Sequence, residues 1–88
     1  MQPLNYAILK HFTKVEEASA NTVMEALKKQ YGHFQAFTKP AVISALMTAE
    51  ANGLLEETSF DLDDNDELQV FYRAHAEGAE TINKYIKD

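Results

Sequence analysis

The stretch that decides the fold runs from residue 45 to residue 58 and reads ALMTAEANGLLEET. Its first half places apolar and small residues at helical spacing, and Gly53 ends that pattern because glycine readily adopts the backbone that terminates a helix. Leu54 and Leu55 then open LLEETSF, a short run of apolar, β-branched and aromatic residues typical of a strand. The stretch therefore predicts a helix that passes directly into a β-strand.

Three helices are predicted in the first half of the chain, each from a three- or four-residue apolar repeat. Ser19 and Thr38 are N-caps for the second and third helices, while Gly32 and Gly53 are their stops. The predicted helices span about residues 3–15, 19–31 and 38–52. Their inner faces are expected to be Leu4, Ala7, Ile8, Phe12 and Val15; then Val23, Ala26, Leu27 and Tyr31; then Val42, Ala45, Leu46 and Ala49.

A β-hairpin is predicted after the third helix, over about residues 54–74, because a second strand, LQVFYRA, follows LLEETSF across an acidic loop. In that second strand Leu68, Val70 and Tyr72 share one face, and Gln69, Phe71 and Arg73 share the other. A last helix is predicted over about residues 77–87, with Ala79, Ile82 and Ile86 on one stripe. The expected fold is mainly α with a small hairpin, in the order α-α-α-β-β-α.

Size and composition exclude several classes of protein. Eighty-eight residues suit one domain, and 45% hydrophobic with 25% charged residues are ordinary globular values. Cysteine is absent, which excludes disulfides and thiolate metal sites. No apolar run approaches the roughly 18 residues that span a bilayer, and no secretion signal is indicated. We therefore expect a single cytoplasmic domain, spanning residues 1–88, that makes no membrane contact.

The net charge of −6 is unevenly distributed. Residues 1–40 hold five Lys and three Glu, residues 41–72 hold eight acidic residues and no Lys or Arg, and residues 73–88 balance. A strongly basic domain would indicate nucleic acid, because neutralising phosphates releases counterions and supplies most non-specific affinity. Charge alone gives no such indication here.

The helix-to-strand junction resembles that of the winged-helix family, in which a recognition helix leads through Gly-Leu into the first strand of a wing. The matching positions are Leu46, Ala49, Gly53, Leu54 and Leu55. The segment VFYRAHAEGAETINKYI looks like the corresponding part of the PadR and MarR families of bacterial transcriptional regulators, with Gly78 at their glycine position. Ala49, Ala74 and Ala76 are smaller than the usual residues, and Phe34, Phe37 and Phe71 are expected to fill the space.

This resemblance implies a regulator that binds duplex DNA, as a homodimer, with its third helix in the major groove. The positions that would face the groove are Thr38, Lys39, Ala41, Ser44 and Thr48. Phosphate contacts would come from Lys28, Lys29 and His33 near the end of the second helix, and from Arg73 in the hairpin. The alternative from the residues themselves is that these are the solvated sides of amphipathic helices.

The acidic stretch DLDDNDE, residues 61–67, opposes insertion of the hairpin into a DNA groove, because each carboxylate near a phosphate costs on the order of 1 kcal/mol in water. Three interpretations remain: the hairpin points away from DNA, the acids keep its tip soluble, or they bind a basic protein. The last makes the chain an acidic interaction module with little DNA affinity. The partner-binding candidates are then Asp61, Asp63, Asp64, Asp66 and Glu67.

Catalysis, cofactors and a structural metal are not predicted. Asp61, Asp63 and Asn65 match the first ligands of a calcium loop, but Asp66 stands at its glycine and Tyr72 at its bidentate Glu. The three histidines have no metal-binding spacing. No serine lies in a nucleophile elbow, and no glycine-rich loop opens a helix. Aromatic residues that could stack on bases are better explained by core packing, namely Tyr31, Phe34, Phe37, Phe60, Phe71 and Tyr72.

Overall fold

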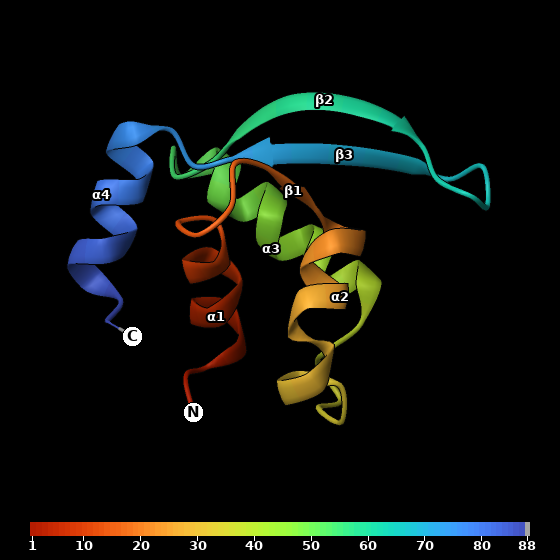
Figure 1. Ribbon diagram of the computed structural model, residues 1–88, viewed down its shortest axis with the longest axis horizontal. Coiled ribbons are helices and arrows are strands. Elements are labelled where there is room, and N and C mark those ends of the chain that lie inside the picture. The colour runs from red at the N-terminus through yellow and green to blue at the C-terminus, as the bar shows by residue number, and fades with distance from the viewer. Residues whose placement is uncertain (88) are drawn as a thin grey trace.

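The computed structural model describes residues 1–87, in which four helices lie against a three-stranded antiparallel sheet (Figure 1). The protein is therefore of the α+β class. The helices are α1 (Leu4–His11), α2 (Ala20–Tyr31), α3 (Lys39–Ala51) and α4 (Ala76–Tyr85), and the strands are β1 (Ala18–Ser19), β2 (Glu56–Leu62) and β3 (Leu68–Arg73).

Helices α2 and α3 begin at the N-caps that the sequence predicts. The Ser19 hydroxyl accepts the backbone N–H of Thr22 at 3.2 Å, and the Thr22 hydroxyl accepts the backbone N–H of Ser19 at 2.8 Å, which completes a capping box. Thr38 caps α3 by accepting the N–H of Ala41 at 3.3 Å. Gly53 follows α3 with a φ of 77°, a left-handed conformation that favours glycine. The predicted N-caps of α2 and α3 and the predicted stop at Gly53 are confirmed.

Helix α1 is shorter than predicted, and this prediction is wrong at its C-terminal end. The helix ends at His11, and the next residues make tight turns, with the N–H groups of Thr13 and Lys14 bonded to carbonyls three residues earlier. Val15 consequently lies outside the helix and is exposed. The turns reverse the chain so that Ala18 and Ser19 can pair with β3.

The two-residue strand β1 is not predicted by the sequence, because AS carries no alternating pattern and directly precedes a strong helix signal. Ala18 pairs with Tyr72 and Ser19 with Phe71, both in antiparallel register, and the sheet order is β1-β3-β2. The Ser19 hydroxyl also donates to the Gln69 side chain at 2.6 Å. The predicted two-stranded hairpin is thus two strands of a three-stranded sheet.

The first hairpin strand begins and ends two residues later than LLEETSF suggests. Leu55 lies before β2 and is buried in the core, whereas Asp61 and Leu62 continue the strand. Phe60 pairs with Val70 and Leu62 with Leu68, after an irregularity between Glu57 and Ser59. The connecting loop is therefore only residues 63–67.

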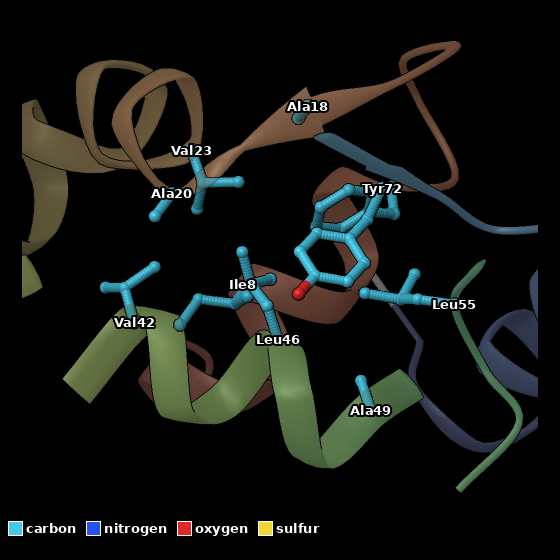
Figure 2. Packing of buried hydrophobic residues seen from close by; sticks show 10 residues of the cluster. Ile8, Ala18, Ala20, Val23, Val42, Leu46, Ala49, Leu55 and Tyr72 are labelled. Carbon is cyan, nitrogen blue, oxygen red and sulfur yellow. The ribbon is translucent and has the colours of Figure 1, made fainter. Parts of the chain in front are cut away.

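The core lies between α3, α1, the start of α2 and the inner face of the sheet (Figure 2). Figure 2 shows the Tyr72 ring between the sheet and α3, with Leu46 and Leu55 beside it. Tyr72 and Phe12 belong to the same buried cluster as Ala49, whereas Phe34, Phe37 and Phe71 are half-buried and lie outside it, so the prediction that these three fill the space at Ala49 is wrong. Ala26, predicted to face inward, is exposed.

Helix α4 packs beside α1, as Figure 1 shows at the left. Ile82 and Ile86 are buried as predicted, but the helix begins at Ala76 and ends at Tyr85 rather than spanning 77–87. The buried Lys10 ammonium donates to the Asn83 side chain at 2.7 Å and to the Ile86 carbonyl at 2.8 Å, which fixes the end of α4 on α1.

Candidate functional site

The residues predicted to face DNA lie on or near α3, but their side chains point in different directions and make different contacts. Thr38 caps the helix. Ala41, Ser44 and Thr48 are exposed along its surface on the side facing α1. Lys39, the first residue of α3, turns instead towards the tip of the β2–β3 hairpin.

Lys39 is held by carboxylates of the same chain. Its ammonium lies 3.3 Å from an Asp63 carboxylate oxygen and 3.7 Å from one of Glu67. The Asn21 amide donates to the same Asp63 oxygen at 3.4 Å. Asp63 thereby ties the hairpin tip to the first turns of both α2 and α3, an internal contact that the interpretations of the acidic loop did not include.

Asp63 also shapes the loop that it belongs to. Its other carboxylate oxygen accepts the backbone N–H groups of Asn65 at 2.8 Å and Glu67 at 3.0 Å. The bonds from Glu67 and Asn65, followed by those from Lys39 and Asn21, lower the pKa of Asp63 from 3.8 to about 2. Asp63 is therefore ionised throughout the physiological range.

The other cations predicted to contact phosphate lie in two places. Arg73 donates to the Glu56 carboxylate at 3.0 Å on the exposed side of the hairpin. Lys28 and Lys29 are exposed in the last turn of α2, and the His33 ring packs edge-on against Phe34 with ring centroids 4.9 Å apart. Arg73 is therefore placed on the hairpin, and Lys28, Lys29 and His33 are placed at or just past the C-terminal end of α2.

A groove of about 390 Å³ runs between α3 and the hairpin, and we call it the hairpin groove. Leu46 and Tyr72 form its buried floor, and Lys39 and Asn21 lie at the end where Asp63 closes the hairpin tip onto the helices. Its size is within the range of binding sites for small ligands or peptide side chains. Its other lining residues are Ala20, Ile43, Met47, Glu50, Glu57, Leu68, Gln69 and Val70.

The walls of the hairpin groove are apolar and unusually exposed. Ile43 and Met47 on α3 are 38% and 57% exposed, and Leu68 on β3 is 60% exposed. Helix α3 carries apolar residues around most of its circumference, yet only its Val42, Leu46 and Ala49 face is buried. An apolar wall left open to water in this way is typical of an interaction surface.

Carboxylates line the rim of this groove. Glu50 from α3 and Glu57 from β2 line the groove itself, and Asp63 and Glu67 lie at its end, next to the tip of the hairpin. Burial raises the pKa of Tyr72, and the negative charges of Glu50 and Glu57 raise it further. The groove therefore favours a ligand that combines apolar groups with positive charge.

The remaining acidic candidates lie on the outside of the hairpin. Asp61 accepts the Gln69 amide at 3.0 Å, and Asp64 and Asp66 are exposed at the tip. Asp66 has a φ of 59°, where a glycine is usual. Among residues 1–87, no group of three or more His, Asp or Glu side chains is placed to hold a metal ion, and no helix there is long and apolar enough to cross a membrane.

A larger groove of about 810 Å³ lies between α1 and α3, lined among others by Leu4, Tyr6, Leu9 and Leu54. The described residues that line it include no charged side chain, so nothing in its chemistry selects a partner. The hairpin groove is the better defined of the two because apolar walls and charge occur there together.

The residues that give this groove its apolar walls and acidic rim are not among the predicted site residues, namely Ile43, Met47, Glu50, Glu57 and Leu68. A signal was present in α3, since Ile43 and Met47 form a second i, i+4 apolar pair beside the inner face. Phe60, expected in the core, is instead 68% exposed on β2.

Comparison of the chain with protein-family models, with curated proteins and with solved structures finds no match.

Proposed function

We propose that the chain is a winged-helix domain that binds a partner protein through the hairpin groove. The observation that carries this proposal is the combination of exposed apolar walls with an acidic rim, next to an α3 whose Lys39 is already paired within the chain. The domain is an interaction module and has no catalytic role.

The topology supports the winged-helix part of the proposal. The order is α1-β1-α2-α3-β2-β3-α4, and the sheet order β1-β3-β2 makes the last two strands a hairpin beside α3. Helices α2 and α3 then correspond to a helix-turn-helix, α3 to the recognition helix, and the β2–β3 hairpin to the wing. A fold of this kind does not by itself specify what is bound.

The charges around α3 argue for protein rather than DNA at this surface. Each rim carboxylate within about 4 Å of a phosphate would cost on the order of 1 kcal/mol in water, and more where water is excluded. A phosphate that approaches Lys39 meets the carboxylates of Asp63, which is also held by two backbone N–H groups, and of Glu67. Lys and Arg side chains of a protein would instead be attracted to the same rim.

The partner that fits is a protein segment with two or three apolar side chains flanked by Lys or Arg. Full burial of one such side chain stabilises a complex by about 1.5–3 kcal/mol. Side chains packed against Ile43, Met47 and Leu68 can therefore supply most of the affinity. The rim acids Glu50 and Glu57 would contribute mainly to specificity and to the rate of association.

The experiment is capture of partners from a lysate of the source cell on the immobilised full chain, followed by binding measurements with the purified partner. Two variants are compared with the wild type, Met47→Glu in the apolar wall and the double variant Glu50→Gln/Glu57→Gln in the rim. Asp64→Asn, outside the groove, serves as the matched charge control. All four proteins should show the same circular dichroism.

The dissociation constant of the purified partner should rise about tenfold or more for Met47→Glu. It should also rise for the double Gln variant, and that rise should be largest at low salt. Asp64→Asn should bind like the wild type. A partner that binds Met47→Glu and the double Gln variant as tightly as wild type would rule out the hairpin groove as its site.

Duplex DNA is a second candidate, favoured by one observation: Lys28 and Lys29 are exposed at the far end of α2 from the hairpin tip. Asn21 and Lys29 are eight positions apart, which is about 12 Å along a helix and exceeds the screening length of about 8 Å at physiological salt. A Lys28→Glu/Lys29→Glu variant should then lose retention of genomic DNA fragments; equal retention would reject this candidate.

A further inference from the structure

Strand β2 forms a free edge of the sheet. It pairs with β3 on one side, and the order β1-β3-β2 leaves its other side unpaired among the described residues (Figure 1). Residues 57–62 are all exposed. An exposed edge strand presents unpaired N–H and C=O groups, which natural proteins usually protect with charged side chains, Pro, bulges or a covering segment. In β2 the charged residues are acidic, namely Glu56, Glu57 and Asp61.

The alternation of hydrogen-bonded and non-hydrogen-bonded pairs along the hairpin determines which backbone groups of β2 point away from β3. The N–H of Asp63 donates to the carbonyl of Glu67 at 2.9 Å, so these residues form a hydrogen-bonded pair at the end of the ladder. Pairs alternate along an antiparallel ladder. Leu62–Leu68 and Phe60–Val70 are therefore the non-bonded pairs, and the N–H and C=O groups of Leu62 and Phe60 face the free edge.

The side chains of the same two residues lie on the groove side of the sheet. Phe60 is opposite Val70 and Leu62 is opposite Leu68, and directly opposite residues project from the same face. Val70 and Leu68 line the hairpin groove. Phe60 and Leu62, 68% and 63% exposed, therefore extend the apolar wall of the groove to the free edge.

We propose that the partner segment adds to β2 as a fourth strand, with alternate apolar side chains beside Phe60 and Leu62 and basic side chains near the carboxylates. This inference rests on the proposed function and specifies how the partner binds. Main-chain hydrogen bonds to an exposed edge then provide affinity, and the alternating side chains provide specificity.

Charge decides between a foreign strand and a second copy of this chain. In an antiparallel pairing of β2 with itself centred on Asp61, the two Asp61 carboxylates are directly opposite each other. Centring on Ser59 places Glu57 opposite Asp61, and centring on Phe60 places Glu57 opposite Asp63. Like charges directly opposite are destabilising in a sheet. A basic segment has the complementary charge in all three registers.

The test selects peptides on the immobilised full chain from a displayed random library about twelve residues long, enough for a strand or three helical turns. Selected peptides are sequenced and synthesised, and amide exchange of the chain is measured by NMR with and without them. The proposal expects apolar residues at every second position with Lys or Arg between them, and slowed exchange at the N–H groups of Phe60 and Leu62.

The other outcomes separate this inference from the proposed function. Enrichment of basic peptides with apolar residues three and four apart, with no protection of the Phe60 and Leu62 amides, would overturn strand addition and leave the hairpin groove as a helix-binding site. Enrichment of no basic apolar peptide would remove both proposals. Period-two peptides that leave both amides unprotected would also overturn strand addition.

A pair of variants tests the backbone contact itself. Leu62→Pro removes an N–H that points away from β3, so it spares the existing ladder, and Leu62→Val keeps the N–H at a similar side-chain size. A selected period-two peptide should bind Leu62→Pro about fivefold more weakly than Leu62→Val, the loss expected for one hydrogen bond. Equal affinities would contradict strand addition.

Discussion

Gly78→Ala is expected to destabilise the protein, although an Ala in a helix is ordinarily more stable than a Gly by about 1 kcal/mol. Gly78 lies in α4 and is buried. A Cβ built there would overlap the Leu54 carbonyl oxygen and lie 3.0 Å from its carbonyl carbon and 3.3 Å from its Cα. Leu54 precedes β2, so this contact fixes the start of the strand that forms one wall of the hairpin groove.

The size of the effect follows from two opposing contributions. Overpacking costs about 1–3 kcal/mol, and the upper part of that range applies because the obstacle is backbone rather than a flexible side chain. Subtracting the helix-propensity gain of about 1 kcal/mol leaves roughly 2 kcal/mol of lost stability. For a domain of this size that corresponds to a fall in Tm of about 8–16 °C.

Thermal unfolding followed by circular dichroism measures this effect, with Gly53→Ala as the control. Gly53 has a φ of 77°, and no atom lies within 4 Å of the position that a Cβ would take there, so its cost is backbone strain of about 1 kcal/mol without a clash. A Tm of Gly78→Ala equal to or above that of the wild type would refute the close approach of α4 to Leu54.

Three further predictions concern contacts that fix the helices and the hairpin tip. Lys10→Met should lower the free energy of unfolding by about 2 kcal/mol, measured in urea, because the buried Ile86 carbonyl and Asn83 side chain lose a charged donor; an unchanged value would contradict this role. Asp66→Gly should raise that free energy by about 1 kcal/mol by relieving the positive φ, whereas a decrease would show that the loop needs the Asp side chain. The Asp63 carboxyl should titrate in NMR near pH 2. Because this folded pKa is below the 3.8 of the free group, the contribution of Asp63 to the free energy of unfolding is complete above about pH 4 and is lost as pH falls through 2. A titration midpoint near 3.8 would disprove the contacts.

Much of the fold could be predicted from local signals. Ser19, Thr38 and Gly53 end or begin helices through their own backbone and side-chain chemistry, so the boundaries of α2 and α3 follow from the sequence. Strand β1 could not be predicted in this way, because two residues have no periodicity and their strand character comes from pairing with Tyr72 and Phe71. The early end of α1 has the same cause, since the chain must turn to make that pairing.

The candidate site was less predictable than the fold. The exposure of Met47 and Phe60 depends on how α3 and the hairpin are placed relative to each other, which is a tertiary property that apolar residue type alone does not indicate. The pairing of Lys39 with Asp63 joins residues 24 positions apart, so the sequence showed a basic helix start and an acidic loop without showing that they neutralise each other.

The most direct test of the central claim is hydrogen–deuterium exchange of the full chain with and without the purified partner. The account predicts slowed exchange in β2, at the N–H groups of Phe60 and Leu62 that face the free edge. Protection confined to the end of α2 around Lys28 and Lys29, with β2 unchanged, would contradict it.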